Sequence, residues 1–133
     1  MSIRFITKYV HAYLDYPVAL SLTVAPFLLH LGSSNPLALW LSVATGIAAL
    51  LLTLLTDHQL GLVRVLPYGF HVAVDRLVGL TFLAAPFVFH LKGLDAAYYW
   101  ANAAAVLTVT FLLNAPEPAS KRVSADGRAA NAI

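Results

Sequence analysis

Apolar residues fill most of the chain in four long runs, and polar residues gather in the stretches between them. The runs lie at roughly 13–31, 37–56, 71–91 and 96–114. Each is close to the length of about 20 mostly apolar residues that a helix needs to cross a bilayer. Only LGSSNP and LKGLDA separate the runs of each pair, which suits tight helical hairpins. The pattern predicts an all-α membrane protein with four transmembrane helices.

This pattern divides the chain into five parts. Residues 1–12 are expected to form a cytoplasmic N-terminal segment, 13–56 a first helical hairpin and 71–114 a second one. A longer, more polar stretch at 57–70 is expected to be a cytoplasmic linker between the hairpins. The polar, proline-containing residues 115–133 are expected to form a disordered cytoplasmic tail.

The two hairpins repeat one sequence pattern at a spacing of sixty residues. Residues 11–31 and 71–91 are identical at nine of 21 ungapped positions, and the identities include His, Asp and Pro, which are rare in this chain. Each unit crosses the bilayer twice, so the second copy enters in the same direction as the first. We therefore expect a parallel repeat that forms a bundle with a pseudo-twofold axis along the membrane normal. Matched residues of the first and third helices then either face each other or point oppositely outward.

Composition supports a membrane location. The chain of 133 residues is 60% hydrophobic and only 11% charged, unlike a soluble domain. Its basic residues form no patch interleaved with aromatics, so nucleic acid is not an expected partner. Cysteine is absent, which excludes disulfides, thiolate metal sites and cysteine nucleophiles.

The basic residues predict the orientation, because cytoplasmic segments of membrane proteins are enriched in Lys and Arg. Lys92 lies in a hairpin link, whereas the others all fall on the opposite side of the predicted membrane: Arg4, Lys8, Arg64, Arg76, Lys121, Arg122 and Arg128. Both termini are therefore expected in the cytoplasm. Of these residues, Arg76 is expected to pair with Asp75 or to extend to lipid phosphates.

The repeated segments resemble a known family. HAYLDYPVALSLTVAPFLLHLG followed by Trp40, and HVAVDRLVGLTFLAAPFVFHLKG followed by Trp100, are similar to the SPW repeat of small bacterial integral membrane proteins. This chain has Ala-Pro-Phe at 25–27 and 85–87 where that repeat has Ser-Pro-Trp. The corresponding positions are His11, Asp15, Pro26 and Trp40, with His71, Asp75, Pro86 and Trp100 in the second copy. The resemblance implies a four-helix protein of the bacterial inner membrane and no particular activity.

Two histidine–aspartate pairs are the first candidate site. His11 and Asp15 are four residues apart, as are His71 and Asp75, so each pair shares one face of a helix. Such a pair can act as a polar layer that joins the hairpins, or can consist of interfacial side chains near a helix N-terminus, where the helix dipole favours an anion. Two histidines and two carboxylates can also hold a divalent metal ion.

His30 and His90 are the second candidate site. They lie nineteen residues beyond His11 and His71, which is about 28 Å along a helix. Paired histidines on facing helices ligate b-type haem, so His30 with His90, and further His11 with His71, predict a haem-binding electron carrier as an alternative function. On a straight helix both layers would not face one axis, unless Pro26 and Pro86 adjust the twist.

Other marked residues have structural interpretations. Pro26 and Pro86 are expected to shape helix packing, and Trp40 and Trp100 to lie in the headgroup belt together with Tyr98 and Tyr99. His58, in the linker, is expected to be an ordinary loop residue. Small residues of the second and fourth runs allow close helix contact and a homodimer.

No motif for catalysis is found, so the chain is not expected to be an enzyme. The favoured hypothesis is a structural or accessory membrane subunit without a cofactor, in which the matched His and Asp residues join the two hairpins. A haem b protein is the alternative, and an oligomeric channel or metal carrier is the third hypothesis. The expected partners are the lipid bilayer and a second copy or a larger membrane complex.

Overall fold

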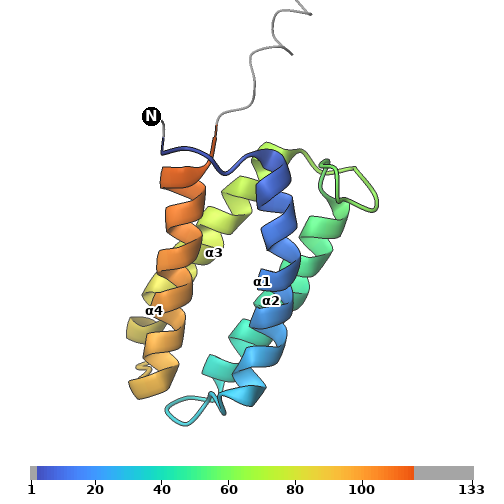
Figure 1. The fold of residues 1–133 in the computed structure, drawn as a ribbon. Helices are drawn as coiled ribbons and strands as arrows, with labels where there is room; N and C mark the ends of the chain where they lie inside the picture. Colours follow the sequence, from blue (N-terminus) through green and yellow to red (C-terminus); the bar gives the residue numbers. More distant parts are fainter. Residues whose placement is uncertain (1–2, 116–133) are drawn as a thin grey trace, which may run out of the picture.

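The computed structural model describes residues 3–115, which fold as an all-helical bundle (Figure 1). Within this range the chain forms four α-helices, and the last continues as a π-helical turn. In chain order these are α1 (Lys8–Leu28), α2 (Leu37–Leu55), α3 (Tyr68–Val88), α4 (Gly93–Leu107) and η1 (Thr108–Leu113). Apart from Ala115, the predicted tail lies outside the described residues.

Three described segments are long and apolar enough to cross a membrane: α2, α3, and α4 together with η1. α1 has the same length as α3, 21 residues, or about 32 Å of helix. Its three tyrosines and two prolines, together with Lys8, His11 and Asp15, lower its hydropathy. The predicted membrane class therefore rests on the other three segments.

Helices α1 and α3 begin before the residues that hydropathy predicts. α1 starts at Lys8, inside the expected N-terminal segment, because Thr7 Oγ1 accepts a hydrogen bond from the Val10 N–H and caps the helix. α3 starts at Tyr68, directly after Pro67. The residues at the start of each predicted span therefore already lie in regular helix.

The same helices also stop three residues before their predicted ends, at Leu28 and Val88. The cause is the left-handed backbone of His30 and His90, whose φ angles are 51° and 52°. This geometry lets the Leu31 N–H donate back to the Pro26 carbonyl, and Leu91 does the same to Pro86, each at 2.9 Å. The pattern is that of a Schellman C-cap, in which glycine is the usual left-handed residue. Leu31 and Leu91, the next residues, are buried.

Packing is closest within each hairpin, where α1 lies along α2 and α3 along α4 (Figure 1). Gly46 of α2 meets the α1 backbone so closely that an added Cβ would lie 2.8 Å from the Ala19 carbonyl oxygen. Gly79 of α3 makes the corresponding approach to the Leu107 side chain. A close contact at a small residue of the second run is therefore found at Gly46, whereas in the second hairpin the close approach is made by Gly79 of the third run, not by a residue of the fourth.

Pro26 opens a hydrogen-bonding position that α2 fills. Because proline has no N–H, the Leu22 carbonyl one turn earlier loses its helical donor, and Ser42 Oγ donates to it at 2.8 Å. The Ser42 oxygen in turn accepts from the Tyr98 hydroxyl at 2.7 Å. Pro26 and Pro86 are both buried, in keeping with a role in helix packing.

The hydrophobic core lies at the end of the bundle that contains the two hairpin links. It includes Leu22, Phe82 and Tyr99, which are almost completely buried. The Tyr99 hydroxyl donates to the Ala38 carbonyl at 2.8 Å. The headgroup position expected for Tyr98 and Tyr99 is therefore wrong, since both rings are buried between the hairpins. Trp40 and Trp100 are exposed beside Phe27 and Phe87 of the neighbouring helix.

The two hairpin links also hold each other. The Asp95 carboxylate, in the first turn of α4, accepts from the Gly32 and Ser34 N–H groups of the first link, each at 2.9 Å. In return, Asn35 Nδ2 donates to the Phe89 carbonyl of the second hairpin at 3.2 Å. At the opposite end of the bundle, the Ile6 N–H donates to the Leu113 carbonyl at 2.9 Å. Contacts between the hairpins are thus concentrated at the two ends.

Candidate functional site

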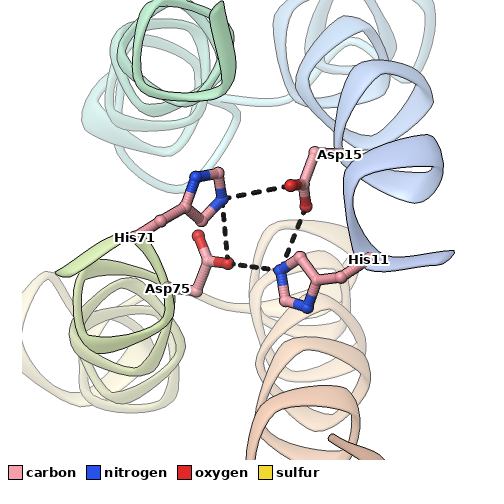
Figure 2. A group of neighbouring side chains, drawn as sticks. All are labelled: His11, Asp15, His71 and Asp75. Atoms are coloured by element: carbon pink, nitrogen blue, oxygen red, sulfur yellow. Dashed lines mark hydrogen bonds and ion pairs between the residues drawn. The ribbon is translucent and has the colours of Figure 1, made fainter. Parts of the chain in front are cut away.

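Four side chains meet between α1 and α3 and form a closed ring of alternating histidines and aspartates, named here the His/Asp ring (Figure 2). His11 Nε2 lies 3.2 Å from Asp15 Oδ1 and 2.8 Å from Asp75 Oδ2. His71 Nε2 lies 3.1 Å from Asp15 Oδ2 and 3.3 Å from Asp75 Oδ2. Each histidine therefore contacts the aspartate of its own helix and that of the other hairpin.

Helix geometry explains the ring. A spacing of four residues places His11 and Asp15 on one face of α1, and His71 and Asp75 on one face of α3. Both aspartates lie beyond the first helical turn. The two faces are directed toward each other, which decides between the two arrangements that the repeat allowed. The histidines are buried, with 3% and 2% of the side chain exposed, and the aspartates are mostly buried at 15% and 19%.

A contact with α2 fixes the His71 ring. The Thr56 hydroxyl donates its single proton to the Leu52 carbonyl at 2.6 Å, so its oxygen accepts from His71 Nδ1 at 2.7 Å. Nδ1 therefore carries a proton, and Nε2 faces two carboxylate oxygens. Two negative oxygens around this nitrogen are favourable only when a positive charge lies between them, either a proton on Nε2 or a bound cation.

His11 has a different environment. Its ring lies edge-on to Tyr68 and to His71, with centroid distances of 5.8 and 5.6 Å. Its Nδ1 atom is buried and has no hydrogen-bond partner within residues 3–115. The two histidines of the His/Asp ring therefore have similar carboxylate contacts at Nε2. They differ at Nδ1, which has a hydrogen-bond partner in His71 and none in His11 within the described residues.

His58 is more than the ordinary loop residue that the sequence predicts. It is 2% exposed, and its ring centroid lies 6.1 Å from that of His71. Nδ1 accepts from the Leu60 N–H at 3.2 Å, so the neutral ring carries its proton on Nε2, which is buried without a partner in the described part of the chain. Burial lowers the pKa of His58 below its usual value, which favours this neutral form.

Arg76 does not form the pair with Asp75 that is one of its two contacts expected from the sequence. Its Nη2 donates to the Thr110 carbonyl in η1 at 2.7 Å, and its guanidinium lies 4.4 Å from the centre of the Phe111 ring. Thr110 is among the last four residues of η1, where helical carbonyls have no donor within the helix, and Arg76 supplies one. Asp75 therefore remains in the His/Asp ring.

A cavity of about 480 Å³ lies next to the His/Asp ring and receives side chains from all four helices. Its wall is mostly apolar, with Val18, Leu52, Val78 and Val106 among the lining residues. Thr45, Thr53, Asn102 and Thr110 provide its few other polar groups. The volume is in the range of about 300–1,000 Å³ typical of small-molecule sites.

The donor set of the His/Asp ring suits a metal ion. One nitrogen or oxygen atom from each of the four residues lies within 4.8 Å of the other three. Sequence reasoning identified all four residues but missed Thr56 and His58. These two stand outside the repeat pattern, and no local sequence signal marks them.

His30 and His90 are not brought into such an arrangement. Both are exposed and lie beyond the ends of α1 and α3, at the left-handed position of the C-caps. A bis-histidine haem requires imidazoles in the bundle interior. The placement of His30 and His90 gives the predicted haem site no support, and the Nε2 atoms of His11 and His71 are engaged by carboxylates.

Comparison with known proteins gives no relative: no family model, no curated protein and no solved structure matches the chain. The resemblance to the SPW repeat therefore rests on the residues quoted above and stays a prediction.

Proposed function

We propose that this chain is a small structural or accessory protein of the bacterial inner membrane, of the SPW-repeat type, and that the His/Asp ring joins its two hairpins. In this proposal α1 also crosses the membrane, and both termini lie in the cytoplasm. The hairpins are a duplicated unit with a pseudo-twofold axis along the membrane normal. The equal lengths of α1 and α3 and the sixty-residue offset between their first residues support the duplication.

The observation that carries the proposal is the crossed contact pattern of the ring. His11 contacts Asp75 and His71 contacts Asp15, so each hairpin supplies both a donor and an acceptor to the other. With both imidazoles protonated, two positive and two negative charges balance. The ring lies beside an apolar cavity, where charge pairs are screened less than in water.

Such a ring stabilises one arrangement of the hairpins against alternatives. Apolar helix faces have little preference for each other in a bilayer, because lipid tails are equally apolar. Removing one member leaves the remaining charges partly buried and unpaired, which costs about 2–4 kcal/mol. The sites of contact with a partner complex would be the lipid-exposed helix surfaces.

Distance measurements between spin labels test the proposal directly. The chain has no cysteine, so Tyr13→Cys and Ala73→Cys place one label on the exposed side of α1 and one on that of α3. With the ring intact, we expect a single narrow distance distribution. Adding Asp15→Asn and Asp75→Asn is expected to broaden it and to lower the free energy of unfolding by about 2–4 kcal/mol.

Asp57→Asn is the matched control, because it makes the same chemical change at an exposed linker position. It is expected to leave the distance distribution unchanged. If the variant with Asp15→Asn and Asp75→Asn keeps the narrow distance distribution of the unaltered protein, the His/Asp ring does not hold the hairpins together and the proposal is wrong.

A further inference from the structure

We propose that His11, Asp15, His71 and Asp75 form a binding site for one divalent transition-metal ion of the Zn²⁺ or Mn²⁺ class. The inference rests on the proposed function, because the four side chains come from two hairpins that must be joined. It goes further because it assigns a ligand to the His/Asp ring, whereas the structural role requires only that the two imidazoles are protonated.

The geometry of the ring is close to that of a coordination shell. One donor atom from each of the four residues lies within 4.8 Å of the other three. The His–Asp contacts, which use both carboxylate oxygens of Asp15 and Oδ2 of Asp75, are 2.8–3.3 Å long. Around a tetrahedral ion with bonds of about 2.0–2.1 Å, neighbouring ligand atoms are about 3.3 Å apart. To accept the ion, the shortest contacts have to lengthen by about 0.5 Å, and donor atoms that lie farther apart, up to 4.8 Å, have to approach by up to about 1.5 Å.

The hydrogen bonds behind the ring point to the same ligand. His71 donates from Nδ1 to Thr56 and directs Nε2 inward, and Thr56 is held in turn by Leu52. Metal-binding histidines are typically oriented by such a bond from the other ring nitrogen. Two imidazoles and two carboxylates without thiolates favour borderline divalent ions over soft ones such as Cu(I).

Two buried polar atoms beside the ring provide a second observation. Within residues 3–115, His58 Nε2 and His11 Nδ1 have no hydrogen-bond partner. Both belong to side chains that are at least nine-tenths buried, and His58 stands directly behind His71. Buried polar atoms nearly always have a protein, water or ion partner. His11 lines the adjoining cavity, where a water coordinated to the ion would supply an acceptor for Nδ1.

Charge balance also fits. Two carboxylates and two neutral imidazoles have a net charge of −2, which one divalent ion neutralises. The same balance makes a monovalent ion a poorer ligand, because it leaves one negative charge in a mostly apolar environment. Lys8 lies toward the Tyr68 ring, 5.4 Å from its centroid, and within residues 3–115 it forms no ion pair with either aspartate.

Metal content of the full-length protein in detergent tests the inference. The protein is stripped with a chelator, dialysed against ZnCl₂ or MnCl₂ and analysed by mass spectrometry. We expect one ion per chain, and X-ray absorption of the Zn²⁺ form with two imidazole nitrogens among its ligands. Thr56→Val is expected to weaken binding about 10–100-fold, because the His71 ring loses its orienting partner.

Control variants separate this site from the exposed histidines. Asp15→Asn with Asp75→Asn is expected to abolish binding, whereas Asp57→Asn and the pair His30→Ala with His90→Ala keep one ion per chain. Absence of metal from the unaltered protein, retention by the ring variant, or an absorption spectrum without imidazole would each overturn the inference. The spectrum is taken on the unaltered protein, so the inference stays testable even if ring variants unfold.

The spin-label distances separate this inference from the proposed function. If the stripped, unaltered protein shows narrow distances but binds no ion, the metal site is wrong and the structural role stands. If it binds an ion while the stripped ring variant keeps narrow distances, the metal site stands and the structural role is wrong.

Discussion

His30 and His90 hold the chain in the left-handed region, where glycine is the usual residue. For an L-amino acid this conformation costs about 1–2 kcal/mol, part of which glycine would lose again through its larger freedom in the unfolded chain. His30 and His90 occupy the same position of two turns with the same backbone geometry. The recurrence of histidine there therefore requires no shared ligand. The imidazoles are exposed at both turns.

Glycine at both turns is therefore expected to be tolerated. The pair His30→Gly with His90→Gly should raise the free energy of unfolding by up to about 1 kcal/mol, measured by thermal unfolding in detergent. The pair His30→Ala with His90→Ala is the comparison, because alanine has a Cβ and lacks a polar side chain, and we expect it to lower stability. A loss of stability in the glycine variant would mean that the imidazoles make contacts that the bundle needs.

At the scale of the elements, each hairpin has one close helix crossing at a glycine, on α2 in the first hairpin and on α3 in the second. At Gly46 an added Cβ would lie 2.7 Å from the Thr23 backbone nitrogen. At Gly79 it would lie 2.7 Å from Cδ2 of Leu107, which is the end of a flexible side chain. Backbone atoms cannot move aside as a leucine methyl can.

Gly46→Ala is consequently expected to be more harmful than Gly79→Ala. We expect the first to lower the free energy of unfolding by about 1–3 kcal/mol and the second by less. Both are measured by thermal or denaturant unfolding of the detergent-solubilised protein. Gly69→Ala, where an added Cβ meets no atom within 4 Å, is the control and should not lower stability, because alanine is a better helix former than glycine. Equal effects at Gly46 and Gly79 would contradict the close backbone approach.

The elements were largely predictable from the sequence, because hydropathy and the repeat depend on local patterns. The spacing of four residues likewise made the pairs His11 with Asp15 and His71 with Asp75 recognisable. Thr56 was missed because it lies 15 residues from His71 and meets it only once α2 and α3 are packed. Positive φ at His30 and His90 is also invisible in the sequence, so the helix ends were placed at residues 31 and 91, three residues after their actual ends.

Across the whole molecule, the hairpins are joined at both ends and separated in between by the cavity. The hydrophobic core and the contacts of Asp95 hold the end with the links, and the His/Asp ring lies toward the end with the termini. Side chains near the middle, such as Thr45 and Asn102, line the space between them. A change at one end can therefore alter the angle between the hairpins while the other end stays packed.

Cysteine labelling tests the proposed membrane topology. Ile3→Cys, Ser33→Cys and Gln59→Cys each introduce a single thiol at an exposed position. A membrane-impermeant maleimide is expected to label Ser33→Cys in intact cells, and the other two only after lysis. Labelling of Ile3→Cys in intact cells together with Ser33→Cys would contradict the proposed crossing of α1.

The contact between Asp95 and the first hairpin link can form only late in the synthesis of the chain. The Gly32 N–H that Asp95 accepts from is 63 residues earlier in the chain. At synthesis rates of about 5–20 residues per second, Gly32 is made about 3–13 s before its carboxylate partner. During this time water can hydrogen-bond to the amide groups of the first link. The two links can therefore dock on each other only after the start of α4 has been made.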